Sequence, residues 1–345
     1  MNAVGLIWLQ FAFCAALIGG AGYQLSLYGD AIAQRTGLSG SWIGLVLLAT
    51  VTSLPELATG ITSVTIAHAP NLALGDALGS CVVNLVFLVV VDLFFRQEPV
   101  WQRASLGHVL AGAFGVVMLG FALVSLLVSQ VMPSPGEVDA AASTQLNIGL
   151  IAPVLLLLYL VAMRTVFAYE RDHAVQAEVE FAADLPELRT AIIHFALVAS
   201  VVAGAGMWLP FVATDLAHAM AWNKSFVGSL FVATATSLPE LAVTLSALRL
   251  GALDMAIGNL LGSNMFNVLI IAVDDLFYRP GVLMASVSPV HAVTAGTAIT
   301  MTGLVMVGLF FKPGSRVLRA VNWISLGLMT MYVLNTYVLY LYGES

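Results

Sequence analysis

Residues 49–58 read Ala-Thr-Val-Thr-Ser-Leu-Pro-Glu-Leu-Ala, and residues 233–242 read Ala-Thr-Ala-Thr-Ser-Leu-Pro-Glu-Leu-Ala. Nine of these ten positions match, and only Val51 differs from its counterpart, Ala235. A second motif follows each copy, because Gly75-Asp76-x-x-Gly79-Ser80-x-x-x-Asn84 aligns with Gly258-Asn259-x-x-Gly262-Ser263-x-x-x-Asn267. Two motifs repeated in the same order indicate an internal duplication that involves both halves of the chain.

The composition around these motifs is that of a protein embedded in lipid. Charged residues make up 9% of the 345 residues and hydrophobic residues 60%, whereas a soluble domain has about 25% charged residues. The mean hydropathy is +0.97. These values exclude a pair of soluble domains, and no basic patch suggests a nucleic-acid partner. Cys14 and Cys81 both lie in apolar runs and predict neither a disulfide scaffold nor a cysteine metal site.

Ten apolar segments are long enough to cross a bilayer, which requires about 20 residues each. They cover approximately residues 4–28, 41–66, 72–95, 104–130, 146–168, 190–217, 224–248, 253–278, 285–311 and 318–341. The sequence therefore predicts an all-α integral membrane protein with ten transmembrane helices. Its two five-helix halves, 1–168 and 190–345, are joined by a polar linker at 169–189.

The positions of lysine and arginine predict the orientation, because these residues concentrate in loops on the inner side of the membrane. With the N-terminus outside, ten of the twelve fall in inside loops and only Lys224 and Arg279 fall outside. We therefore expect both termini outside and the linker in the cytoplasm. The expected location is the inner (plasma) membrane of a prokaryotic-type cell.

The repeated motifs fall in the second and third segments and again in the seventh and eighth. Five segments separate the copies, an odd number, so the second copy enters the membrane upside down. Inverted repeats with polar, proline-broken helices are typical of secondary transporters, whose ions bind near the bilayer midplane. The two copies are thus predicted to meet there around a pseudo-twofold axis.

The first motif supplies oxygen ligands for a hard cation. Pro55 cannot donate a backbone hydrogen bond and crowds the preceding turn, so we expect unpaired carbonyls near Ala49 and Val51. Thr52 and Glu56 are four residues apart and share a helix face. Carboxylates, hydroxyls and carbonyls together suit Na⁺ or Ca²⁺ better than soft metals. The second copy offers the same set in Thr236, Ser237, Pro239 and Glu240.

The second motif places polar side chains at intervals of four along one helix face. The first copy presents Asp76, Ser80 and Asn84, and the second presents Asn259, Ser263 and Asn267. No lysine or arginine is expected at the depth of Glu56 and Glu240, each of which would cost at least a few kcal/mol at the bilayer centre without a partner. A bound cation or a proton is the expected partner.

The other aspartates on these helices are interpreted separately. Asp76 lies two helical turns before the end of its stripe, about 12 Å along the axis at 1.5 Å per residue. We therefore expect it at the outer mouth of the pathway, either attracting cations or capping the helix. Asp92, Asp274 and Asp275 lie at the far ends of the same helices. Asp92 and Asp275 each precede an arginine by four residues, which predicts surface ion pairs.

Together, the two copies of Thr-Ser-Leu-Pro-Glu and the helices that follow them resemble the alpha-repeats of the cation/calcium exchanger superfamily, most closely the sodium/calcium exchangers. The resemblance implies antiport of Ca²⁺ against Na⁺, both ions being cargo, with no cofactor. It implies that Glu56 and Glu240 are ligands shared by both ions and that Thr52 and Thr236 complete the calcium site. One flanking sodium site would consist of the Ala49 carbonyl, Ser53 and Ser80, and the other of the Ala233 carbonyl, Ser237 and Ser263. Asn84 and Asn267 would face the middle.

Some positions depart from the family pattern and leave alternatives open. Cys81 replaces the asparagine of Gly-Ser-Asn, and Asn267 stands where several sodium/calcium exchangers carry an acid. An H⁺-coupled exchanger of Ca²⁺ or another divalent ion such as Mn²⁺ is therefore an alternative, because burial favours protonated carboxyls. A remote alternative is an intramembrane aspartyl protease that uses Asp30 and Asp76. Its Gly-x-Gly-Asp motif is absent, however, since residues 73–76 read Ala-Leu-Gly-Asp.

Overall fold

The chain is described by a computed structural model that covers residues 3–36, 49–94, 100–131, 151–173, 186–249, 253–314 and 322–343. Within these ranges all regular secondary structure is helical. The first part of the predicted second span, residues 41–48, and most of the predicted linker lie outside the described residues.

Eight helices are long and apolar enough to cross a membrane on their own. They are α1 (Ala3–Thr36), α5 (Pro70–Phe94), α7 (Gly107–Val131), α8 (Ile151–His173), α9 (Leu188–Met220), α13 (Leu253–Phe277), α14 (His291–Phe311) and α15 (Trp323–Tyr342). A further span runs from Lys224 to Arg249 and bends by 43° at its centre. The all-α membrane fold predicted from the sequence is confirmed, and the ten-span plan accommodates every described helix.

The two copies of Thr-Ser-Leu-Pro-Glu break their helices at the same place. In the first copy α3 (Ala49–Thr52) ends and α4 (Leu54–Thr65) begins on either side of Ser53. In the second copy α11 (Ala233–Thr236) ends and α12 (Leu238–Arg249) begins on either side of Ser237. Proline is well tolerated in the first turn of a helix, where its missing N–H has no intrahelical partner, so Pro55 and Pro239 each begin a new segment. The second broken span consists of α10 (Lys224–Val227), a π-helical turn η3 (Gly228–Val232), α11 (Ala233–Thr236) and α12 (Leu238–Arg249).

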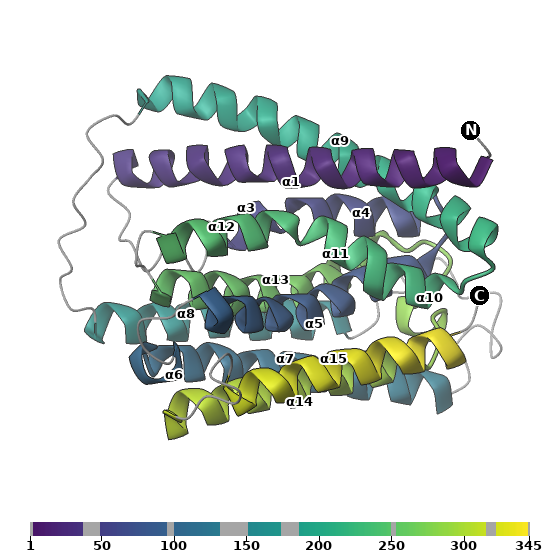
Figure 1. Ribbon diagram of the computed structural model, residues 1–345. Coiled ribbons are helices and arrows are strands. Elements are labelled where there is room, and N and C mark those ends of the chain that lie inside the picture. The colour runs from purple at the N-terminus through teal and green to yellow at the C-terminus, as the bar shows by residue number, and fades with distance from the viewer. Residues whose placement is uncertain are drawn as a thin grey trace.

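The helices form layers that run along one common direction (Figure 1). The long helices α1 and α9 lie side by side along one face of the bundle, next to α4 and α12. Helices α5 and α13 pack together in the centre. Of the residues in the apolar stretch that could cross the membrane, 72% are buried in α5 and 83% in α13, against 17% in α1. Helices α7, α14 and α15 cover the opposite face, and both chain ends lie at the same end of the bundle. The repeated polar helices are therefore the best-shielded part of the fold.

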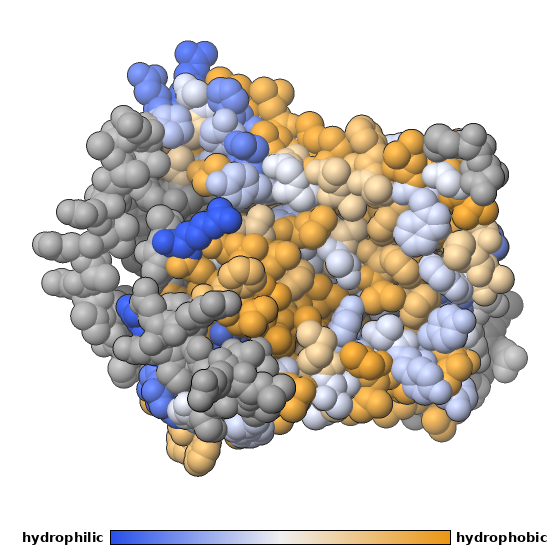
Figure 2. Space-filling model, viewed as in Figure 1, coloured by the Kyte–Doolittle hydropathy of each residue, from blue (hydrophilic) through white to orange (hydrophobic). Residues whose placement is uncertain are grey.

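The outer surface of the bundle is suited to lipid. Large apolar side chains such as Leu9, Leu157, Leu197 and Phe310 are exposed on α1, α8, α9 and α14. Figure 2 shows hydrophobic residues over most of the middle of the face in view, with the most hydrophilic ones gathered toward the left end. Two short helices, α6 (Val100–Arg103) and η4 (Leu283–Ala285), lie in connections between spans.

Helices α1 and α9 touch the broken helices through glycines that are related by the repeat. A Cβ atom on Gly22 of α1 would lie 2.3 Å from Cγ of Pro239, at the start of α12. A Cβ atom on Gly206 of α9 would lie 2.9 Å from the carbonyl oxygen of Pro55, at the start of α4. Only glycine permits such close approach between helices. Each broken helix is thus held by one long helix at the turn that carries its glutamate.

Candidate cation-binding site

The two copies of the first motif meet in the centre of the bundle and exchange hydrogen bonds. The Ser53 hydroxyl donates to Oε1 of Glu240 over 2.9 Å, and the Ser237 hydroxyl donates to Oε1 of Glu56 over 3.1 Å. All four side chains are fully buried. Each serine therefore holds the glutamate of the other repeat, as expected if a pseudo-twofold axis passes between them. The sequence prediction that these residues meet is correct.

Both glutamates retain unused charge. Glu56 lies in the first turn of α4 and Glu240 in the first turn of α12, where the positive end of the helix dipole favours a carboxylate. The second oxygen, Oε2, of each has no hydrogen-bond partner among the described residues. Neither forms an ion pair within that part of the chain. Each of these two buried carboxylates therefore has one oxygen that can bind a cation.

The Ala49 carbonyl, which the sequence predicts to be loosened by the helix break, is hydrogen-bonded, and so is the carbonyl of its counterpart Ala233. The carbonyl oxygen of Ala49 accepts from Ser53 N over 3.1 Å and from the Thr52 hydroxyl over 3.3 Å. The Ala233 carbonyl accepts from Ser237 N over 3.1 Å. The Thr236 hydroxyl lies 3.3 Å from the same oxygen, but its single proton is donated to the closer Asp76 carboxylate at 2.9 Å. These backbone bonds persist because each proline removes only the N–H that would reach the carbonyl four residues before it, which is Val51 or Ala235.

Asp76 is in the site rather than at the outer mouth. It is 1% exposed, and its Oδ1 accepts from the Thr236 hydroxyl over 2.9 Å and from Ser80 over 3.5 Å. Its Oδ2 has no partner among the described residues. Both sequence interpretations, a vestibule charge and a helix cap, are wrong, because distance along one helix says nothing about a neighbour that crosses it. Thr236 comes from the other repeat and joins Asp76 to the glutamate pair.

The second motifs also meet across the axis. Asn84 Nδ2 donates to Oδ1 of Asn264 over 3.1 Å, and Asn264 Nδ2 donates to the Cys81 carbonyl over 3.1 Å. Cys81 and Asn264 occupy equivalent positions in the two repeats, so the departure from Gly-Ser-Asn lies directly on the axis. Oδ1 of Asn84 and both polar atoms of Asn267 are buried and have no partner in the described ranges. The two amide oxygens are available as neutral ligands.

The remaining residues of the predicted site lie in the same buried cluster. The Thr52 hydroxyl is 3.4 Å from the Ser263 hydroxyl, which links α3 to α13. Asn259 donates to the Glu240 carbonyl over 3.3 Å, so it supports the turn that carries this glutamate. No group of three or more His, Cys, Asp or Glu side chains in the described ranges is arranged to hold a resident metal. The cluster therefore combines two carboxylates at its centre with hydroxyls and amides.

The three aspartates at the far ends of α5 and α13 are buried. Oδ2 of Asp92 accepts from Asn322 N over 2.7 Å and from the Ser325 hydroxyl over 2.6 Å, at the start of α15. Oδ1 of Asp275 accepts from Leu283 N over 2.9 Å. The predicted surface position of Asp92 and Asp275 is therefore wrong, since both are buried. Asp92 holds the start of α15, and Asp275 holds the segment that follows α13. The predicted partner of Asp92, Arg96, lies outside the described residues. The third, Asp274, is discussed below. Spacing alone could not separate these roles, because a carboxylate at a helix end serves either.

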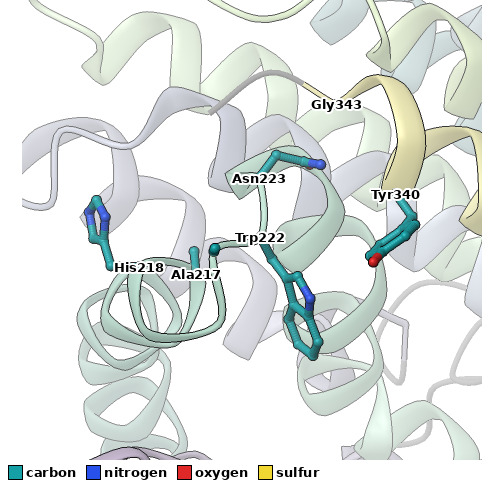
Figure 3. Close-up of a pocket in the computed structure, with 7 residues that line it drawn as sticks. Ala217, His218, Trp222, Asn223, Tyr340 and Gly343 are labelled. Atoms are coloured by element: carbon teal, nitrogen blue, oxygen red, sulfur yellow. The ribbon is translucent and has the colours of Figure 1, made fainter.

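A pocket at one end of the bundle lies outside this cluster. It has a volume of about 420 Å³ and is lined by Ala217, His218, Ala221, Trp222, Asn223, Tyr340 and Gly343 (Figure 3). Trp222 stacks on Phe231, and Phe226 packs against both Trp222 and Tyr340. Aromatic side chains of this kind gather at the membrane–water boundary. The lining of this pocket is typical of that boundary, and it shares no residue with the candidate ion site.

These observations define a class of protein, a multi-pass membrane transporter whose two inverted repeats enclose a buried cluster of carboxylates, hydroxyls and amides. The model of the sodium/calcium exchanger protein family matches residues 6–168 and 190–341. The chain belongs to this family and is therefore a cation antiporter and not an enzyme.

Individual relatives agree with this assignment. The sequence is 28% identical over 242 residues to the inner membrane protein YrbG of Escherichia coli strain K12, which covers 69% of this chain and 70% of that protein. It is 28% identical over 269 residues to the putative antiporter CaxA of Alkalimonas amylolytica, covering 75% and 77%. A shorter match of 115 residues, 33% of this chain and 30% of the relative, is 37% identical to the sodium/calcium exchanger MaX1 of Methanosarcina acetivorans.

Solved structures share the fold. The sodium-calcium exchanger NCX_Mj, soaked with Na⁺ and Sr²⁺, superposes with a TM-score of 0.59 at 22% identity, covering 96% of this chain and 98% of that one. Native YfkE superposes with a TM-score of 0.63 at 17% identity, covering 96% and 92%. At these identities the likeness establishes the arrangement of helices over almost the whole chain.

Proposed function

We propose that the chain exchanges Ca²⁺ against Na⁺, and that Glu56 and Glu240 bind both ions in turn. The observation that carries this proposal is the reciprocal pair of hydrogen bonds from Ser53 to Glu240 and from Ser237 to Glu56. These bonds fix one oxygen of each carboxylate and leave the other for an ion. Two carboxylates balance one dication or two monovalent ions, so the two cargoes exclude one another at a common site.

The flanking ligands are proposed from the residues nearest this pair. Asn84 and Asn267 offer amide oxygens beside the glutamates, and Thr52 and Thr236 would turn their hydroxyls toward Ca²⁺. In the sodium-bound form the carbonyls of the two repeat-related alanines would join the flanking sites of the serines. Because each carbonyl already accepts a backbone hydrogen bond and has a threonine hydroxyl 3.3 Å away, we expect Na⁺ binding there to require the neighbouring threonine to change rotamer. Such a change would make the threonines a switch between the two cargoes.

Proton coupling is the second candidate, with Ca²⁺ or another divalent ion such as Mn²⁺ as the partner. The observation in its favour is Asp76, a third buried carboxylate joined to the glutamates through Thr236. A site with three acids and one dication has a negative charge left over, which a proton neutralises at low cost in a dry environment. The amide of Asn267 also removes an acid from the position where several exchangers carry one.

We further propose that both termini face outside and that the linker is cytoplasmic. The described basic residues Arg35, Arg103, Arg164 and Arg249 occur in connections that this topology places inside, whereas Lys224 and Arg279 occur on the opposite side. The aromatic pocket near Trp222 then marks the outer boundary. Cysteine labelling of a C-terminal residue in intact cells tests the orientation, and protection from an impermeant reagent would contradict it.

The decisive experiment is uptake of radioactive calcium into proteoliposomes that contain the purified chain. An outward Na⁺ gradient, a pH gradient and no gradient are compared side by side. Acceleration by the Na⁺ gradient supports the first proposal, and acceleration by the pH gradient alone supports the second.

Two conservative variants test the site itself. Glu56→Gln and Glu240→Gln are isosteric and keep the acceptor for the cross-repeat serine, but each removes one of the charges that balance a dication. We expect each variant to insert and purify normally and to lose divalent uptake. Uptake at the wild-type rate by both variants would show that the ion binds elsewhere.

A further inference from the structure

Asp274 is a buried carboxylate that the proposed exchange site does not use. It lies on α13 and is 1% exposed. Neither Oδ1 nor Oδ2 has a hydrogen-bond partner among the described residues, whereas its neighbour Asp275 holds the backbone of Leu283. An ionised carboxylate buried without a partner costs several kcal/mol. Its retention in the core calls for a positive charge beside it.

A glycine on the neighbouring broken helix makes room for this carboxylate. A Cβ atom on Gly60 of α4 would lie 2.5 Å and 2.6 Å from the two oxygens of Asp274, so any other residue would displace it. Gly60 lies one helical turn after Glu56 and shares its face. Ser63, three residues further on, has a fully buried hydroxyl with no hydrogen-bond partner in the described ranges. Asp274 therefore stands on the continuation of the face that carries Glu56.

Asp274 also continues the polar stripe of its own helix. It follows Asn267 by seven residues, which is two turns of α13 and returns to the same face. The acids whose charges interact with Asp274 are Asp76 on α5 and Asp275 beside it. His291, at the same end of the bundle, is engaged with Asn71 over 3.2 Å. Every charge identified around Asp274 is thus of the same sign as its own.

The repeat has no counterpart to Asp274. The offset of 183 residues that aligns Asp275 with Asp92 places Asp274 opposite Val91. Asp76 likewise has no acidic counterpart, since Asn259 stands opposite it. Both extra acids lie in the half of the bundle where α5 begins and α13 ends. The Ser288 N–H, in the connection before α14, donates to Oδ1 of Asn71 over 2.7 Å and holds that connection against the start of α5.

We propose that Asp274 binds one monovalent cation, Na⁺ or H⁺, at a site next to Gly60 and separate from the central glutamates. A single carboxylate balances one positive charge. A divalent ion is disfavoured, because a single carboxylate balances only one of its two charges, whereas the central site offers two carboxylates. The proposal rests on the proposed function and extends it, since the chain would then bind one cation more than its repeated motifs supply. The extra ion binds on the side of the bundle that holds the α4–α5 connection.

The test counts bound ions in the purified full-length protein without Ca²⁺. Equilibrium binding of radioactive sodium at alkaline pH is compared for the wild type and for Asp274→Asn, which keeps the shape and removes the charge. We expect saturation to fall by one Na⁺ per chain. If sodium saturation is unchanged and potentiometric titration shows one proton fewer taken up, the bound cation is H⁺. If neither count changes, Asp274 holds no exchangeable cation and the proposal is overturned.

A second variant separates cation binding from the presence of the carboxylate. Gly60→Ala keeps Asp274 but pushes it from its place, so half-saturation of the extra site should rise on the order of tenfold, in line with the cost of overpacking. Gly115→Ala on α7 is the matched control, because a Cβ there meets no atom within 4 Å. If Gly60→Ala binds like this control, the site does not lie at Gly60.

The outcome is independent of the fate of the central site. Glu56→Gln is expected to lose Ca²⁺ uptake while the ion count at Asp274 stays intact. Asp274→Asn is expected to lose one monovalent cation while Ca²⁺ still binds. If Glu56→Gln transports normally and Asp274→Asn still loses its ion, the proposed function fails and the extra site stands.

Discussion

The contact between Gly22 and Pro239 allows a sharp test of how the long helices control the site. A Cβ on Gly22 would lie 2.3 Å from Cγ and 2.6 Å from Cβ of Pro239, a rigid ring that cannot turn aside. Ordinary contact begins at 3.4 Å, so Gly22→Ala must move α1 or the start of α12 by about 1 Å. Pro239 is followed directly by Glu240, whose Oε1 accepts from the Ser53 hydroxyl over 2.9 Å. The shift therefore reaches a candidate ligand directly.

The magnitude follows from two opposing effects. Overpacking of this kind costs about 1–3 kcal/mol, and replacing glycine by alanine within a helix returns up to about 1 kcal/mol. Because the 2.3 Å overlap is with a rigid ring, the cost falls in the upper part of this range, about 2–3 kcal/mol. The conformation that contains this contact should therefore lose about 1–2 kcal/mol net, which corresponds to a factor of roughly 5–30. We expect the initial rate of calcium uptake into proteoliposomes to fall by this factor.

The repeat itself provides the controls for this experiment. Gly20→Ala and Gly204→Ala occupy equivalent positions in the two halves, and a Cβ at either meets no atom within 4 Å. Gly206→Ala should behave like Gly22→Ala, because its Cβ would lie 2.9 Å from the Pro55 carbonyl oxygen. Uptake by Gly22→Ala within about twofold of Gly20→Ala would refute the argument that α1 positions the glutamate turn.

Three further variants probe how the side chains share the ions. Ser53→Ala and Ser237→Ala each remove a hydrogen bond to a carboxylate, worth about 1.5–3 kcal/mol. The Na⁺ concentration that half-activates uptake should therefore rise roughly tenfold or more, and the affinity for Ca²⁺ should fall less. Equal losses for both ions would argue against separate sodium sites. Asp76→Asn keeps an acceptor for Thr236 and places in the first repeat the residue that the second already carries at Asn259. The thermal midpoint should therefore hold or rise while the maximal uptake rate falls. An unchanged maximal rate would show that Asp76 takes no part in transport.

The duplicated motifs made the centre of the structure predictable, and the residues outside the duplication did not follow the same logic. Ser53 and Glu240 must meet if two inverted copies pack around an axis, since symmetry then requires the reciprocal pair as well. Asp76 was misplaced because its partner Thr236 reaches it from the other repeat, 160 residues away. Asp92 was misread because its partner Asn322 lies 230 residues away. Asp274 has no motif around it, and only its burial and the room left by Gly60 set it apart.

The departures from symmetry have a physical consequence for an exchanger. Two identical inverted repeats would make the two halves of the ion pathway equivalent, so an ion would bind with the same affinity from either side. In the alignment of the two repeats, Asp76 corresponds to Asn259 and Asp274 corresponds to Val91. Both unmatched acids lie in the same half of the ion pathway. These charges cannot set the direction of net transport, because the ion gradients do so. They do make the two binding steps unequal, and the half-saturating cation concentration is therefore expected to be lower on the side that carries the extra acids.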